Sequence, residues 1–112
     1  MRTQESKLKQ QVKEFLKLKG VASLTRPVFG ARGFYWMPVP GAFGAPFLDF
    51  VGCYNGRFFA IETKALGQKP TPRQQINIAL VEQSRGEVWV GDDFDEFKDW
   101  WRTWLTETKI KV

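Results

Sequence analysis

The dipeptide Asn55-Gly56 constrains the fold of this chain more than any other feature, because it lies between two runs of apolar residues. The runs read FLDFVGCY over residues 47–54 and RFFAIETK over residues 57–64. Asn-Gly in this setting predicts a β-hairpin with a two-residue type I′ turn, since both central positions of that turn need a positive φ. The length and type of this turn also set the register of the two strands.

The predicted register brings three charged side chains together. It places Tyr54 opposite Arg57, and counting back along both strands places Asp49 opposite Glu62. Lys64 is two residues beyond Glu62 and therefore points to the same face of the sheet. The remaining residues on both faces of the hairpin are mostly apolar, which is typical of central strands. We therefore expect two carboxyl groups and an ammonium group at one end of a buried hairpin.

Two opposed carboxylates repel each other, by about 4 kcal/mol at ~4 Å and an intermediate dielectric. Three arrangements would offset this repulsion: protonation of one acid, neutralisation by Lys64, or a divalent cation bound to both acids. A fourth alternative is an exposed sheet edge where water screens the charges. Carboxylate oxygens without histidine or cysteine suit Mg²⁺ or Mn²⁺. Such a cation supplies a water nucleophile for phosphodiester hydrolysis, which an ammonium group such as that of Lys64 would assist.

Composition excludes several kinds of chemistry. The 112 residues include no histidine, so Ser-His and Cys-His nucleophiles and His-ligated zinc are excluded. The single cysteine excludes an internal disulfide and is compatible with a reducing cytosol. A net charge of +5 favours a polyanionic partner. No apolar run reaches the roughly 18 residues of a membrane span, and the N-terminus does not resemble a secretory signal, so we expect no membrane association.

The remaining chain predicts one α/β domain over residues 1–112 with a mixed sheet. Its order is a helix, three strands, a helix, a strand and a helix. The helices are predicted within residues 4–19, 72–84 and 92–107. The strands are predicted at residues 21–29, in the hairpin and at residues 86–91. Residues 30–46 are predicted to form a short strand or extended piece followed by a Gly-rich loop. Thr71 and Asp93 are the expected N-caps of the second and third helices.

Two further polar residues are predicted to face inward. Glu5 precedes Leu8 by three residues on the apolar stripe of the first helix, whereas Glu14 lies on the opposite side. Gln74 shares a helical spacing with Ile78 in the second helix. Both Glu5 and Gln74 are therefore candidate site residues.

Asp49 followed by Glu62-Thr63-Lys64 resembles the motif of the PD-(D/E)XK nuclease superfamily, an acid followed by (D/E)-x-K on the next strand. Within that superfamily the chain resembles the VRR-NUC family, which includes small stand-alone members from bacteriophages. The matching segments are Glu5, GAPFLDFVG, GRFFAIETKA and TPRQQ. The chain departs from the family pattern in one respect, since two residues separate Pro46 from the first acid.

This resemblance implies a restriction-endonuclease-like core and a metal-dependent DNA endonuclease. By the resemblance, Asp49, Glu62 and the carbonyl of Thr63 would hold Mg²⁺ or Mn²⁺, and Glu5 would be an extra metal ligand. Lys64 would be the catalytic lysine, with Gln74 beside the site. Stand-alone relatives imply a homodimer that cleaves branched DNA such as Holliday junctions, in the cytoplasm of a bacterium or of a phage-infected host cell.

Two other interpretations stay open. In the first, the chain is a non-catalytic nucleic-acid-binding module on the same fold. In the second, it is a basic structural domain in which Asp49, Glu62 and Lys64 form a buried charge network. Candidate phosphate contacts are Lys69, Arg73 and some lysines of the first helix, and Trp100 is a candidate dimer contact.

Overall fold

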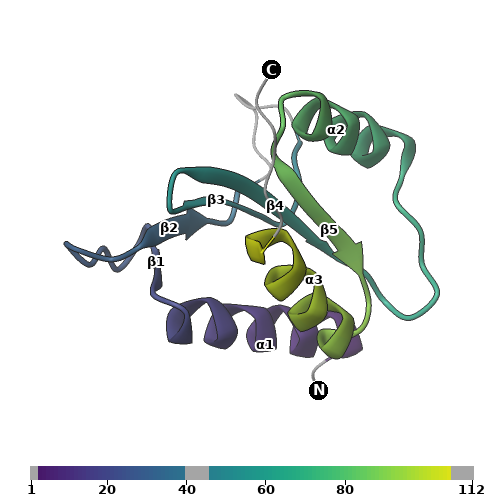
Figure 1. Cartoon of the computed structure of the whole chain (residues 1–112). Coiled ribbons are helices and arrows are strands. Elements are labelled where there is room, and N and C mark those ends of the chain that lie inside the picture. Colours follow the sequence, from purple (N-terminus) through teal and green to yellow (C-terminus); the bar gives the residue numbers. More distant parts are fainter. Residues whose placement is uncertain (1–2, 40–45, 107–112) are drawn as a thin grey trace.

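The computed structural model describes residues 3–39 and 46–106. Its helices are α1 (Gln4–Leu18), α2 (Pro72–Gln83) and α3 (Phe94–Thr106). Its strands are β1 (Val21–Ser23), β2 (Gly33–Trp36), β3 (Phe50–Tyr54), β4 (Arg57–Thr63) and β5 (Glu87–Gly91). They form one sheet in the order β1-β2-β3-β4-β5, in which β1 with β2 and β4 with β5 are parallel and the other neighbours are antiparallel (Figure 1). The predicted α/β class with a mixed sheet is confirmed.

The hairpin has the predicted turn and register. Asn55 and Gly56 have φ of 50° and 80°, as a type I′ turn requires. Tyr54 pairs with Arg57, and the ladder continues to the pair of Phe50 and Ile61. Both strands are central in the sheet, so the end of this hairpin lies between other elements rather than at an edge.

Two predictions about the strands were wrong. Four strands, not three, precede α2, because the short strand or extended piece expected in residues 30–46 is a strand, β2. The predicted strand over residues 21–29 ends at Ser23, since the N–H of Arg26 donates to the carbonyl of Ser23 and closes a turn there. Residues 40–45 of the predicted Gly-rich loop and Glu107 of the predicted last helix lie outside the described residues.

The helices cover the two faces of the sheet unequally. Helices α1 and α3 lie together on one face and α2 lies on the other (Figure 1). The larger core is formed by α1, α3 and the inner sheet face, and is rich in aromatic side chains, among them Phe50, Phe59, Phe97, Trp101 and Trp104. A smaller core under α2 contains Leu48, Ala60 and Val81. Among the described residues, no helix combines the length and apolar character needed to cross a membrane.

Candidate metal-binding active site

The predicted acid pair lies where the β3–β4 ladder ends. Beyond the pair of Phe50 and Ile61, side chains replace the backbone partners. The N–H of Asp49 donates to Oε1 of Glu62 at 3.0 Å, and the N–H of Thr63 donates to Oδ2 of Asp49 at 3.0 Å. Each acid therefore accepts a backbone hydrogen bond from the segment that carries the other. These reciprocal bonds bring Asp49 and Glu62 together, as the register predicted.

Thr63 holds the carboxylate of Asp49 through two donors. Besides its N–H, its hydroxyl donates to the same Oδ2 at 2.7 Å. Thr63 is 1% exposed and ends β4, so its geometry is set by the sheet. The expected role of its carbonyl as a metal ligand stays a prediction.

Glu62 is buried, and its charge is compensated only in part. Its side chain is 5% exposed, which makes the alternative of a water-screened surface pair wrong. Burial, and then the negative charge of Asp49, raise the pKa of Glu62, while Lys64 opposes this rise with Nζ 3.3 Å from Oε2. Two of the three expected ways to relieve the repulsion are thus visible in the protein itself: a tendency toward protonation and a neighbouring ammonium.

Gln74 connects the acid pair to the start of α2. Its Nε2 donates to Oε2 of Glu62 at 2.8 Å, and its Oε1 accepts hydrogen bonds from Nζ of Lys64 and from the N–H of Thr71. The hydroxyl of Thr71 accepts from the N–H of Gln74 at 3.2 Å, which completes a capping box. The predicted inward orientation of Gln74 is confirmed, and one side chain both caps the helix and orients two charged groups.

Lys9 is a site residue that the sequence reasoning missed. Its Nζ lies 3.7 Å from Oδ1 of Asp49 and 3.4 Å from Oε2 of Glu5. Glu5 therefore joins the site through Lys9, and Glu14 is exposed on the other side of α1, as predicted. The signal was present, since Lys9 follows Glu5 by one helical turn and adjoins buried Leu8. The lysines of the first helix, however, were considered above only as candidate phosphate contacts.

A concave surface opens beside Asp49. This cavity of about 280 Å³ is lined by Lys9, Met37, Pro38, Val39, Pro46, Phe47, Leu48 and Asp49. The carbonyl of Pro46 accepts a hydrogen bond from Nδ2 of buried Asn77, which ties the segment before Asp49 to α2. The extra residues between Pro46 and the acid thus contribute the wall of the cavity.

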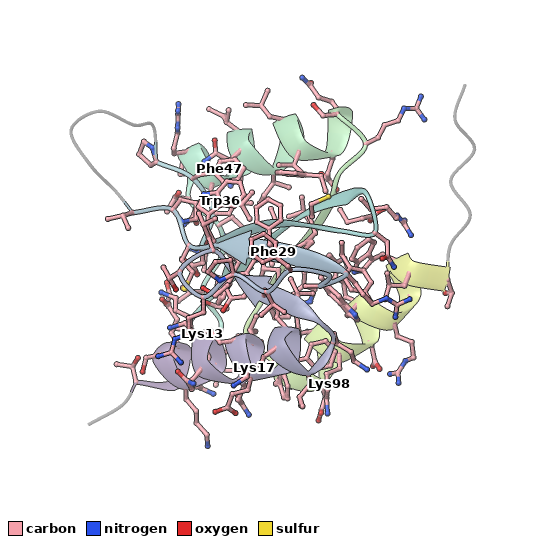
Figure 2. The ribbon with its side chains drawn as sticks, turned by 90° about the vertical axis from the view of Figure 1, so that its left-hand side faces the viewer. Lys13, Lys17, Phe29, Trp36, Phe47 and Lys98 are labelled. Atoms are coloured by element: carbon pink, nitrogen blue, oxygen red, sulfur yellow. The ribbon has the colours of Figure 1, made fainter. Side chains whose placement is uncertain are left out.

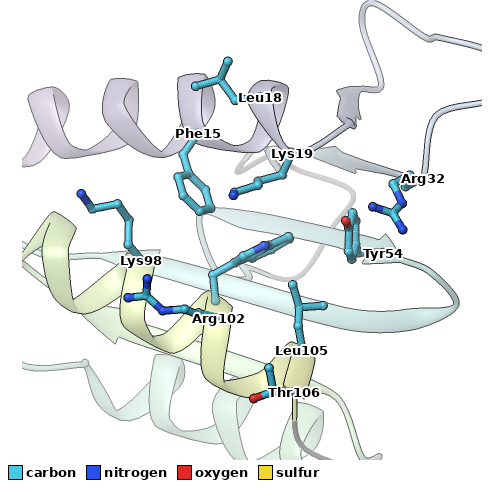
Figure 3. A pocket seen from close by; sticks show the side chains of 10 residues that line it. Phe15, Leu18, Lys19, Arg32, Tyr54, Lys98, Arg102, Leu105 and Thr106 are labelled. Carbon is cyan, nitrogen blue, oxygen red and sulfur yellow. The ribbon is translucent and has the colours of Figure 1, made fainter.

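A larger cavity lies elsewhere, between α1 and α3 (Figure 3). Its volume is about 550 Å³, and its charged lining consists of Lys19, Arg32, Lys98 and Arg102. No carboxylate lines it, so it offers no ligands for a hard metal ion.

The acid pair fits a hard divalent cation. Mg²⁺ is commonly held by one or two carboxylates, keeps several waters and also binds substrate phosphate oxygens. Within residues 3–39 and 46–106, no group of three or more histidine, cysteine or acidic residues is close enough to form a complete protein cage. The two acids would therefore supply only part of the coordination shell of such an ion, and water molecules would supply the rest.

The raised pKa of Glu62 predicts a pH dependence of folding in the metal-free protein. The folded state binds this proton more tightly than the unfolded chain, where the pKa is about 4.5. The resulting stabilisation is full below that ordinary value and is lost as the pH rises through the raised pKa. Thermal unfolding in EDTA from about pH 4 to pH 8 is expected to show this loss in the wild-type protein but not in Glu62→Gln.

The control for this experiment is Glu82→Gln, which changes an exposed glutamate of α2 and should unfold as the wild type does across the pH range. A wild-type stability that rises relative to Glu62→Gln with increasing pH would contradict the expected sign.

No protein-family model matches the chain, and no curated protein matches it at a significant level.

Proposed function

We propose that this protein is a metal-dependent endodeoxyribonuclease that hydrolyses phosphodiester bonds in branched DNA. The observation that carries the proposal is the joining of Asp49 and Glu62 by reciprocal hydrogen bonds, with Lys64 and Gln74 bonded to the second acid. The motif resemblance to PD-(D/E)XK nucleases of the VRR-NUC type supports the same chemistry. That resemblance is also the basis for proposing a homodimer, a four-way junction as substrate and a cytoplasmic location.

In this mechanism Asp49 and Glu62 would hold a divalent cation, and Thr63 keeps the carboxylate of Asp49 oriented. A bound Mg²⁺ would lower the pKa of a water molecule and offset the charge of the scissile phosphate. The water oxygen forms a bond to phosphorus, the bond from phosphorus to one ester oxygen breaks, and that oxygen leaves with a proton. Nζ of Lys64 donates a hydrogen bond toward the attacking oxygen or the phosphoryl oxygens, and Gln74 fixes the position of that ammonium.

The burial of Glu62 beside a second acid supports this function over a purely structural charge network. Burial and Asp49 raise the pKa of Glu62, so the charged form of this acid opposes folding in the absence of a cation. A site that is unfavourable for folding alone is expected where ligand binding offsets the cost. A nucleic-acid-binding module without catalysis is the second candidate, because the net charge of +5 favours a polyanionic partner whether or not the acid pair binds a metal.

The decisive experiment is a cleavage assay on a four-way junction, a flap and a linear duplex of the same sequence. Each substrate is incubated with Mg²⁺, with Mn²⁺ and with EDTA. We expect cleavage of branched DNA in either metal and none in EDTA, together with an increase in melting temperature on addition of Mn²⁺. Binding of the junction without cleavage in either metal, and without this increase, would assign the chain to the non-catalytic class.

Lys9 is expected to weaken metal binding, because its ammonium lies 3.7 Å from an oxygen of Asp49. The Lys9→Met protein should bind Mn²⁺ a few-fold more tightly in calorimetric titration, since partly exposed pairs contribute at most about 1 kcal/mol. Lys13→Met removes a charge one turn further along α1 and serves as the control. An unchanged or weaker Mn²⁺ affinity for Lys9→Met would show that its ammonium does not compete with the cation.

A further inference from the structure

Part of the sheet face that α2 covers is left open. Helix α2 packs over β4 and β5, while two aromatic side chains of β2 on the same face are exposed: Phe34 at 45% and Trp36 at 36%. Their rings stack with centroids 6.0 Å apart and an angle of 18° between the planes. We call Phe34 and Trp36 the ring pair. Adjacent exposed aromatic rings form an apolar patch, and such patches are candidate binding surfaces.

The ring pair is continuous with the candidate active site. Trp36 pairs with Val51, which is two residues from Asp49, the residue that directly precedes β3. The residues that directly follow Trp36, numbers 37–39, line the cavity beside Asp49 together with Phe47. A ligand that extends from Asp49 through this cavity therefore reaches Trp36 without leaving the protein surface.

Positive charge lies across the sheet edge from the ring pair. Figure 2 shows Trp36 and Phe47 near α2 at the top and Lys13 and Lys17 on α1 at the bottom, with the sheet between them. Lys9, Lys13 and Lys17 follow one another by four residues, a rise of about 6 Å each, so they form a row that begins at Asp49. Within the part of the chain that the structure describes, neither Lys13 nor Lys17 forms an ion pair.

We propose that this surface binds unpaired nucleotides of the DNA strand next to the cleaved bond. One base stacks on the ring pair, a neighbouring nucleotide occupies the cavity, and phosphates lie toward the lysine row. Single-stranded DNA offers the base faces that aromatic side chains bind, whereas the bases of a duplex are stacked on one another. The proposal rests on the proposed nuclease function and specifies its substrate: branched DNA with a single-stranded segment at the branch.

The test measures binding in EDTA, where cleavage cannot interfere. Fluorescence anisotropy compares a labelled single strand, a flap with a single-stranded arm and a duplex of matched sequence. Removing a ring while keeping apolar volume, in Trp36→Leu or Phe34→Leu, should weaken binding of the single strand and the flap by roughly tenfold. Trp36→Phe keeps a ring and should retain most of the affinity. Duplex binding should change by less than about twofold in all three variants.

Ile76→Ala is the matched control, because it removes an exposed apolar side chain from α2 rather than from the open sheet face. Its affinity for every substrate should equal that of the wild type. Melting curves of all variants establish that each is folded at the temperature of the binding measurement.

Three results would overturn the proposal: equal wild-type affinity for the single strand and the duplex, no loss of single-strand binding in either leucine variant, or an equal loss on the duplex. A dimer that dissociates in Trp36→Leu, with DNA binding unchanged, would assign the surface to a second copy of the chain. The proposed nuclease function is tested separately. It is wrong if no substrate is cleaved although the ring pair still binds single strands.

Discussion

Asp49→Asn and Lys64→Met are each expected to reduce metal-dependent cleavage at least about a hundredfold, with little change in fold. Asparagine keeps an oxygen that can accept the two hydrogen bonds from Thr63 but loses the charge that a divalent cation needs. Methionine keeps the length of Lys64 but removes the ammonium that lies 3.3 Å from Glu62. Single-turnover cleavage of the preferred branched substrate in saturating Mg²⁺ measures both effects.

The two variants should differ in metal binding. Asp49→Asn is expected to lose the stabilisation by Mn²⁺, whereas Lys64→Met should retain it, because only the first changes a metal ligand. Lys98→Met, which alters a lysine of the distant α1–α3 cavity, is the control and should cleave at the wild-type rate. Cleavage that survives both site substitutions would place the catalytic centre elsewhere.

Gln74→Ala is expected to affect stability and catalysis together. The substitution removes half of the capping box of α2 and leaves the carboxylate of Glu62 and the ammonium of Lys64 without their shared partner. Loss of the cap and of a buried hydrogen bond suggests a decrease of about 1–3 kcal/mol in the free energy of unfolding. Urea denaturation measures this decrease, and the cleavage rate should fall because Lys64 is no longer held in place.

Gln74→Glu separates the two roles of this residue. Glutamate at the third position of a helix also completes a capping box, so the helix start should be preserved. The new carboxylate lies against Glu62, however, and like charges there should make metal-free stability decrease with rising pH more steeply than in the wild type. If Gln74→Glu and Gln74→Ala lose equal stability at low pH, where the carboxyl groups are protonated, the capping role is wrong.

The sequence alone was sufficient for the hairpin and for the acid pair. Asn55-Gly56 determines a local turn, and a turn of fixed length determines which residues lie opposite each other, so Asp49 and Glu62 could be brought together without knowledge of the rest. The inward position of Gln74 followed from helical spacing and its cap from Thr71, both of which are local as well. The predicted number of strands was wrong, since β1 and β2 are short and form by pairing with neighbouring strands rather than from a local signal.

Tertiary structure decided what lies around that pair. Lys9 approaches Asp49 only because α1 packs on the face of the sheet, and no local rule relates residues forty positions apart. The burial that raises the pKa of Glu62, and the exposure of Phe34 and Trp36, depend equally on where the helices sit on the sheet. The local sequence therefore determined the candidate catalytic residues, because a turn of fixed length determines the strand register. Long-range packing determined which charged groups surround these residues and which surface leads to them.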